Sequence, residues 1–391
     1  MKPVAEFDII VYGASGFTGR LVAEYLAQRY GVGGEVKWAM AGRSAAKLAA
    51  VRDEIGAPAE TPLVEADADD PASLRAMVGR AKAIITTVGP YQLYGNDLVA
   101  ACAASGTDYL DLCGEPAWMR KMIDAHDAEA KRTGARIVFS CGFDSIPFEL
   151  GVYFLEETAK AKLGAPVPRV RGRVRKMQGG ASGGTIASLK ATMASVAKDP
   201  AVLDLLRNPF ALTPGFQGPE QPHGMAVEFD AAIDAWVAPF VMAAINTRNV
   251  HRANALLGHA WGADLVYDEM MIAGPGEQGE AFAKAMAGAN MLGGDGGPQP
   301  GEGPSKAERE AGFYDVLFVG EAADGKQVRV AVGGDKDPGY GSTSKMISEA
   351  AVCLIQDAAH PPGGVWTPGA AMGDRLIKLL VDNAGMTFEV E

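Results

Sequence analysis

The sequence predicts an α/β protein in which a Rossmann-type doubly wound parallel sheet precedes a smaller α+β domain with a mainly antiparallel sheet. Three observations lead to this fold class. Short apolar runs alternate with amphipathic helical windows over residues 7–145, the first such junction carries three glycines, and the alternation ends near residue 147. With 391 residues, 48% of them hydrophobic and 21% charged, the chain is long enough to form two cores.

Six buried strands are expected in the first part of the chain. Strands that are separated by helices of this length imply right-handed crossovers and a parallel sheet covered on both faces. The expected strands are 7–13, 35–43, 61–67, 81–89, 107–114 and 135–142, and the helices between them are 18–30, 45–56, 71–80, 96–106 and 117–134.

The second part of the chain has a different pattern. Strands are expected at 169–177 and as a pair within 313–334, where Asp324 and Gly325 supply a hairpin turn. Helices are expected at 184–198, 239–261, 343–359 and 373–383. We therefore expect three parts, namely a Rossmann domain over 1–146, a substrate and dimerisation domain over 147–345, and C-terminal helices over 346–391 that pack back on the first domain.

Composition excludes several classes of protein. The net charge of -12, from 36 Lys+Arg and 48 Asp+Glu, argues against nucleic-acid binding, which needs a basic footprint. The longest apolar stretch of the second part, 236–245, contains a proline and is far shorter than the roughly 20 residues of a bilayer span. The four cysteines form no CxxC pair, so we expect free thiols and a cytoplasmic location. The histidines do not occur at metal-binding spacings, so we expect no bound metal.

The sequence GASGFTG at 13–19 predicts a phosphate-binding turn, with a plain strand-to-helix turn as the alternative. Gly13 permits the tight turn, Gly16 lets the backbone approach a pyrophosphate, and Gly19 lets helix and strand pack closely. The helix that follows offers unpaired N–H groups at its positive end. The expected cofactor contacts are Gly13, Ala14, Ser15, Gly16, Phe17, Thr18 and Gly19.

The end of the second strand indicates NADP(H). An NAD enzyme needs an acidic residue there, whereas this chain has Gly42 followed by Arg43, whose guanidinium fits a 2′-phosphate. The alternative is that the basic residues are solvated surface charges. Asp67, after the third strand, is either an adenine contact or a helix cap. The remaining expected cofactor contacts are Gly42, Arg43, Ser44, Lys47, Asp67, Val88, Gly89, Pro90 and Tyr91.

Three segments lie at the carboxyl ends of the last three strands, where a nicotinamide ring is expected: VGPYQLYG (88–95), DLCGEP (111–116) and CGFDSIPFELG (141–151). With these motifs the chain resembles the saccharopine dehydrogenase-like oxidoreductases, including the branch of trans-acting enoyl reductases. The resemblance continues in GASGFTG, AGR, SGGTIAS (182–188), APFVMAAINTR (238–248), DPGYGSTSKM (337–346) and the tail from residue 363, so it spans nearly the whole chain.

The resemblance implies an NADP-dependent reductase with a Rossmann domain and a smaller substrate domain, and three functions stay open. The favoured one is reduction of a C=C (enoyl) bond in a lipid- or polyketide-like small molecule. The second is imine reduction of the saccharopine type in amino-acid metabolism. The third is an NADP-binding, lipid-associated scaffold without turnover.

Enoyl reduction needs hydride delivery to the β-carbon, a donor for the enolate oxygen and a proton for the α-carbon. Glu115 or Asp144 could orient the nicotinamide carboxamide or relay a proton, although Asp144 and Ser145 could instead cap the next helix. Each tyrosine candidate has the alternative of a packed ring with a satisfied hydroxyl. The candidate donors are Tyr91, Tyr94, Tyr340 and Lys345.

The strand RVRGRVRK (169–176) is unexpected in an acidic protein. Its period of two places Arg169, Arg171, Arg173 and Arg175 on one face. That face could dock an acidic carrier protein, bind CoA phosphates or grip substrate carboxylates, and the alternative is a solvated face that discourages edge pairing.

The expected partners follow from these patterns. The apolar segments 236–245 and 267–274 are either the lining of an acyl pocket or plain core. We expect an apolar or acyl small-molecule substrate, an acyl carrier or CoA moiety attached to it, at most peripheral lipid contact, no nucleic acid, and a homodimer.

Overall fold

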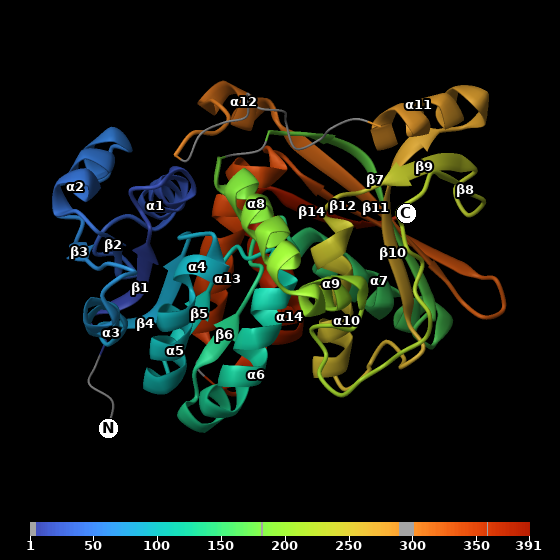
Figure 1. The fold of residues 1–391 in the computed structure, drawn as a ribbon. Coiled ribbons are helices and arrows are strands. Elements are labelled where there is room, and N and C mark those ends of the chain that lie inside the picture. Colours follow the sequence, from blue (N-terminus) through green and yellow to red (C-terminus); the bar gives the residue numbers. More distant parts are fainter. Residues whose placement is uncertain (1–4, 181–182, 289–300, 358) are drawn as a thin grey trace.

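Two seven-stranded sheets form the framework of the described residues, which are 5–180, 183–288, 301–357 and 359–391 of this computed structural model (Figure 1). The first sheet has the order β13-β6-β5-β4-β1-β2-β3 with all pairs parallel. Strands β1 to β6 follow the Rossmann order and confirm the predicted doubly wound sheet. These strands are β1 (Phe7–Tyr12), β2 (Trp38–Gly42), β3 (Leu63–Glu65), β4 (Ala81–Thr86), β5 (Asp108–Leu110) and β6 (Arg136–Val138).

The crossover helices of this sheet bring their N-termini to the carboxyl ends of the strands. The strand order reverses between β1 and β4, and ligands of such sheets bind at the crevice outside the carboxyl ends there. The helices are α1 (Phe17–Tyr30), α2 (Ala45–Glu54), α3 (Pro71–Val78), α4 (Tyr91–Tyr94), α5 (Asn96–Ser105) and α6 (Pro116–Thr133).

The second sheet has the order β14-β12-β11-β7-β10-β9-β8, and only the pair β7 and β10 is parallel. This confirms the mainly antiparallel sheet and the predicted hairpin, which β11 and β12 form. The strands are β7 (Arg169–Gln178), β8 (Glu228–Asp230), β9 (Ala235–Pro239), β10 (Val266–Gly274), β11 (Phe313–Glu321), β12 (Gln327–Gly334) and β14 (Met386–Val390).

Helices flank the second sheet and connect it to the first. The helix expected at 239–261 begins later, because residues up to Pro239 pair with β10 as strand β9. None of the helices in the described residues combines the length and apolar character needed to cross a bilayer. The helices are α7 (Ile146–Leu163), α8 (Gly183–Lys198), α9 (Pro200–Arg207), α10 (Ala243–Leu256), α11 (Gly276–Gly288), α12 (Lys306–Ala311), α13 (Thr343–Gln356) and α14 (Pro368–Ala384).

The C-terminal part of the chain ties the two sheets together. Helix α13 meets α1, where the hydroxyls of Tyr25 and Tyr30 donate to the buried carboxylate of Glu349 over 2.6 and 2.8 Å. Neither of the two short strands in this part was predicted from the sequence. Strand β13 (Gly364–Trp366) extends the first sheet, and β14 lies at the edge of the second.

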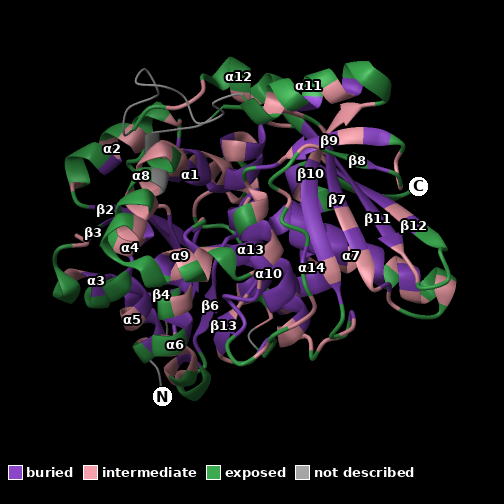
Figure 2. Cartoon of the chain, turned by 45° about the vertical axis from the view of Figure 1, so that its right-hand side comes forward, coloured by how far each residue is buried: buried purple, intermediate pink, exposed green. Residues whose placement is uncertain are grey.

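One hydrophobic core runs from the first sheet through α7 and α13 to the second sheet (Figure 2). Val237, Ala238 and Met270 belong to the fully buried side chains, so these parts of the two apolar segments are core. The proline- and glycine-rich stretch at 293–305 lies mostly outside the described residues.

Candidate active site

The turn after β1 depends on glycine at two positions. Gly13 has a φ of +90°, and its N–H donates to the carbonyl of Ala41 over 2.9 Å. A Cβ on Gly19 would lie 2.2 Å from the carbonyl oxygen of Gly13. Any side chain at Gly19 would therefore push α1 away from β1, so the glycine spacing serves both the turn and close helix–strand packing.

The N-terminus of α1 is open to an anion. Gly16 is the N-cap, no described side chain caps this end, and the first turn has no acidic residue. Ser15 and Gly16 are exposed, and the first amides of the helix have no carbonyl partner inside it. An open positive helix end beside a glycine turn fits the pyrophosphate of a dinucleotide.

The residues after β2 lie close to this turn. A Cβ on Gly42 would lie 3.5 Å from Ser15 Oγ. Arg43 and Lys47 are exposed, and among the described residues neither forms an ion pair. Ser44 Oγ accepts from the N–H of Lys47 over 3.3 Å and so caps α2. An unpaired guanidinium at this position fits a 2′-phosphate.

The end of β3 resolves one of the open alternatives. Helix α3 is capped by Asp70, whose carboxylate accepts from the N–H of Ala72 over 2.9 Å. Asp67 accepts from the N–H of Asp69 instead, so it is not the helix cap. Sequence reasoning missed Tyr12, a buried residue whose pKa is raised to about 12 by burial and by the carboxylate of Asp67. An adenine contact for Asp67 stays a prediction.

We expect Arg43→Ala to weaken NADPH binding by about 1 to 3 kcal/mol, the range of a charge-assisted hydrogen bond, and to leave NADH binding nearly unchanged. Fluorescence titration of the purified protein with each cofactor measures both affinities. Equal losses for NADPH and NADH would contradict the assignment of Arg43 to the 2′-phosphate.

The loop after β4 is held from within the protein. Val88 is half-buried, Gly89 is exposed and Pro90 is buried. The buried carboxylate of Glu115 accepts from the N–H groups of Tyr91 and Gln92 over 2.9 and 3.0 Å. Glu115 therefore fixes this loop at the start of α4.

The structure favours the alternative interpretation of Tyr91, in which its ring is packed in the protein and its hydroxyl already has hydrogen-bond partners. Its hydroxyl donates to the carbonyl of Thr86 over 3.3 Å and accepts from the N–H of Leu112 over 3.1 Å. The residue is buried, and burial raises the pKa of its hydroxyl. This geometry does not support Tyr91 as a proton donor to substrate.

The other three candidate donors do not meet at one point. Tyr94 is 43% exposed on α4. Tyr340 is buried, its hydroxyl lies 3.0 Å from Thr185 Oγ1, and its ring contacts the ring of Phe17 edge-on at 5.2 Å. The ammonium of Lys345 donates to the carbonyl of Ala384 over 3.2 Å, at the end of α14, so the geometry does not support this lysine as a donor.

The turn that carries Asp144 is fixed on two sides. The N–H of Ile146 donates to the carbonyl of Gly142 over 2.8 Å, and the N–H of Phe143 donates to Thr343 Oγ1 over 2.9 Å. The expectation that Asp144 or Ser145 caps α7 is wrong, because no side-chain cap is formed. Ser145 Oγ instead accepts from the side-chain amide of Asn249 over 2.8 Å.

The Asp144 carboxyl lies at the rim of the first sheet. A Cβ on the exposed Gly114 would lie 3.6 Å from Asp144 Oδ2. Asp144 is half-buried, has no hydrogen-bond or ion-pair partner among the described residues, and burial raises its pKa to about 7. A carboxyl with this pKa is poised to exchange a proton at neutral pH.

A second buried carboxyl faces this region from the other sheet, and sequence reasoning missed it. Glu269 on β10 accepts from the hydroxyl of Tyr267 over 2.8 Å and from the side-chain amide of Asn246 over 2.9 Å. Burial raises the pKa of Glu269 to about 8, and the charge of Asp144 acts in the same direction. The only sequence signal for this pair was a polar residue, Glu269 or Asn246, within a mostly apolar run. Whether the two side chains meet depends on how β10 and α10 pack.

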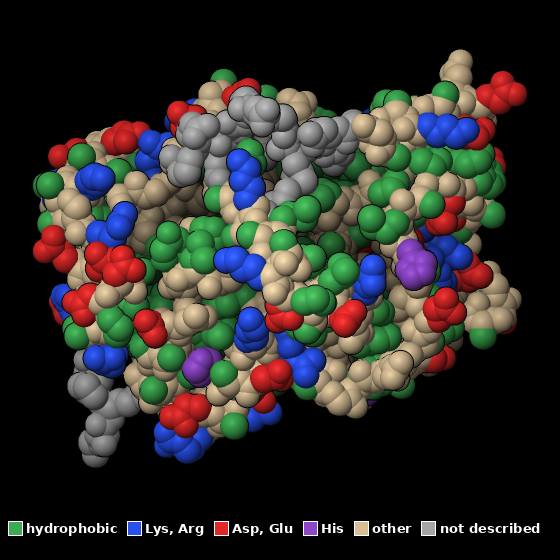
Figure 3. All heavy atoms as spheres, in the orientation of Figure 1, with side chains coloured by type: hydrophobic (Ala, Val, Ile, Leu, Met, Phe, Trp, Pro, Cys, Tyr) green, Lys and Arg blue, Asp and Glu red, His purple; other side chains and the backbone are tan. Residues whose placement is uncertain are grey.

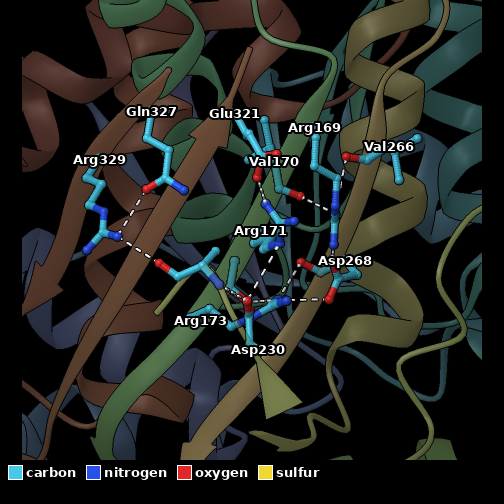
Figure 4. Close-up of polar contacts among 12 residues, drawn as sticks. Arg169, Val170, Arg171, Arg173, Asp230, Val266, Asp268, Glu321, Gln327 and Arg329 are labelled. Atoms are coloured by element: carbon cyan, nitrogen blue, oxygen red, sulfur yellow. Dashed lines mark hydrogen bonds and ion pairs between the residues drawn. The ribbon is translucent and has the colours of Figure 1, made fainter. Parts of the chain in front are cut away.

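The arginine strand is neither a docking face nor a solvated edge, which corrects both expectations (Figure 4). Strand β7 lies inside the sheet between β11 and β10. Arg173 is 1% exposed and pairs with Asp230 over 2.7 Å and with Asp268 over 2.8 Å. The remaining pairs are Arg169 with Asp268, Arg171 with Glu321 and with Asp230, and Arg175 with Asp315 and Glu391.

Comparisons with known proteins show which family the chain resembles. Residues 9–138 match the model of the saccharopine dehydrogenase NADP-binding domain. A trans-acting enoyl reductase of Mycobacterium ulcerans is 38% identical over 408 residues, which cover 96% of both chains, and one of Mycobacterium tuberculosis is 37% identical over 404 residues with the same coverage. The fold is similar to apo saccharopine dehydrogenase (L-Glu forming) of Saccharomyces cerevisiae, with a TM-score of 0.56, 11% identity and coverage of 98% of this chain and 100% of that one.

Proposed function

The chain belongs to the saccharopine dehydrogenase-like family, in its branch of trans-acting enoyl reductases, and from this premise we propose that it reduces the C=C bond of an enoyl thioester with an apolar, lipid- or polyketide-like chain. It is an NADP-dependent reductase. The proposal concerns the substrate. A homodimer and a cytoplasmic location stay predictions from the sequence.

The observation that carries the proposal is the unpartnered Asp144 carboxyl beside Gly114. Reduction of an enoyl group requires a proton at the α-carbon, and a carboxyl whose pKa is about 7 is partly protonated at neutral pH. NADPH supplies the hydride for the β-carbon. Because the hydrogen bonds of Phe143 and Ile146 fix its turn, Asp144 would hold its proton at a constant position relative to the sheet.

The remaining residues of the site bind and orient. The open N-terminus of α1 would hold the pyrophosphate, and Arg43 the 2′-phosphate. Glu115 keeps the loop 88–92 in place through two backbone amides, so that Val88 and Gly89 border the expected nicotinamide position. The small residue at Gly114 leaves the Asp144 carboxyl accessible from the rim.

Imine reduction of the saccharopine type is less well supported, because a dicarboxylic substrate needs available cations. The four arginines of β7 are paired with carboxylates. Two further buried arginines donate to backbone carbonyls: Arg248 to Ala244 and Leu206, and Arg252 to Leu212 and Val365. The terminal nitrogens of these two guanidinium groups therefore already have acceptors inside the protein.

An NADPH-oxidation assay on two substrate panels tests the proposed reaction. One panel contains enoyl thioesters of increasing chain length, and the other contains α-keto acids paired with amino acids as imine precursors. We expect turnover on the enoyl panel that increases with chain length. Turnover confined to the imine panel would contradict the proposal, and tight NADPH binding without turnover on either panel would favour the scaffold.

A further inference from the structure

A cleft with a volume of about 240 Å³ opens between helices α4, α5 and α6 of the first sheet and helices α8 and α9. Gln92 and Trp118 line it on the side of the first sheet, and Thr192, Ser195 and Val202 line it on the other side. Glu115 also lines it. The next residue back along the chain is Gly114, which borders the Asp144 carboxyl, so the Glu115 side of the cleft lies one residue from the proposed reaction site.

Helix α8 forms the roof of this cleft. The side chain of Gln92 donates to Thr192 over 3.4 Å and accepts from the hydroxyl of Ser195 over 2.6 Å. A Cβ on Gly89 would lie 3.7 Å from Ser188 Oγ. No described side chain of α8 is fully buried, so this helix covers the loop after β4 without belonging to the core. Figure 1 shows α8 crossing the face of the molecule between the two sheets.

The lining combines hydroxyl and amide groups with apolar surface. Thr192, Ser195 and Gln92 provide hydrogen-bonding groups, whereas Trp118 and Val202 provide apolar contact. A pantetheine arm has the same mixture, since it consists of methylene groups interrupted by two amides. Ligand sites of this type fix orientation through a few polar groups in a mainly apolar wall.

One lysine lines the cleft, although the chain as a whole carries a net charge of -12. Lys121 lines the cleft, is exposed, and has no ion-pair partner among the described residues. Lys198 lies three positions after Ser195 and therefore on the same side of α8, and α8 contains no acidic residue. Figure 3 shows Lys and Arg side chains over α8 and beside the adjoining end of α6.

We propose that this cleft binds the 4′-phosphopantetheine arm that carries the enoyl group, with the phosphate at Lys121 and the thioester end beside Gly114. The arm is common to coenzyme A and to acyl carrier proteins, and this site recognises the shared chemistry. The inference rests on the proposed enoyl reduction for the thioester, but arm binding itself does not require turnover. It replaces the arginine strand, whose cations are all paired, as the place for a phosphate of the substrate.

Direct binding tests the site without relying on activity. We expect 4′-phosphopantetheine, titrated by calorimetry into the full chain saturated with NADP⁺, to bind the wild type and to bind Lys121→Glu about tenfold more weakly or worse, because a charge-assisted contact becomes a repulsion. Lys190→Glu is the matched control, since Lys190 is exposed on α8 but does not line the cleft. It should change the affinity by less than about twofold, because exposed charges at a distance are screened.

Kinetics then identify the source of the arm. An enoyl group is offered as the N-acetylcysteamine thioester, which lacks the phosphate, as the CoA thioester and as the carrier-protein thioester. Lys121→Glu should raise KM about tenfold for the two phosphate-bearing substrates and leave that of the first unchanged. No binding of 4′-phosphopantetheine by the wild type, or equal weakening by both lysine variants, would overturn the cleft assignment. Binding without turnover of any thioester would support the arm site and overturn the proposed reaction.

Discussion

Asp144→Asn is expected to lower kcat for enoyl reduction by about 10²- to 10⁴-fold, the contribution of a positioned general acid. The amide has the shape of the carboxyl but cannot deliver a proton. Fluorescence titration should show NADPH affinity close to that of the wild type, because Asp144 lies in the turn between β6 and α7 and not in the glycine turn after β1. The neutral amide should also not destabilise the fold, since burial already favours the uncharged form of this side chain.

The pH profile distinguishes proton donation from a structural role for Asp144. Burial raises the pKa of this carboxyl to about 7, so the fraction of the acid form falls as the pH rises through about 7. The wild-type rate should decline on that alkaline side, and the Asp144→Asn variant should lose this limb of the profile. A limb that persists in the variant would show that another group titrates.

Tyr94→Phe is the matched control among the candidate donors. Tyr94 is 43% exposed on α4, and the change removes only a hydroxyl, so we expect kcat to fall less than about threefold. The measurement is the same NADPH-oxidation assay. A loss as large as that of Asp144→Asn would instead place the donor on α4.

Local pattern was sufficient for the six strands of the Rossmann sheet, because each is a short apolar run bounded by a helix with a recognisable start. It was insufficient for β13, which has only three residues and exists because Gly364–Trp366 pairs with Arg136–Val138. The same applies to β14, whose residues pair with β12 far back in the chain. Periodicity needs several residues of one element, whereas these strands are set by tertiary pairing.

The candidate site divides in the same way. The glycine turn could be predicted because its shape depends on the backbone conformation at a single strand end, whereas the role of Arg43 at a 2′-phosphate stays a prediction. The partners of Tyr91 and Lys345 could not, since a hydroxyl or an ammonium is satisfied by groups distant in sequence. Glu269 and Asn246 come together only when β10 and α10 are packed, which no local pattern encodes.

The arginine strand leads to a second prediction with a large effect. Period two correctly placed the guanidinium groups on one face of β7, but the carboxylates that neutralise them come from β8, β10, β11 and the residue after β14. We expect Arg173→Ala to lower the free energy of unfolding by about 3 kcal/mol, because it leaves Asp230 and Asp268 buried without their shared cation. The value belongs at the low end of the usual range, since Arg169 still pairs with Asp268 and Arg171 still lies 3.8 Å from Asp230.

Urea denaturation of the full chain measures this loss, and Arg175→Ala is its control. Arg175 also makes two ion pairs, but its side chain is 29% exposed, so water can solvate the carboxylates it leaves and the cost should stay below about 1 kcal/mol. A small loss for both variants would mean that the face of β7 is solvated in solution. A free cationic face would then compete with Lys121 as the place where a phosphate of the substrate binds, so the same experiment bears on the assignment of the cleft.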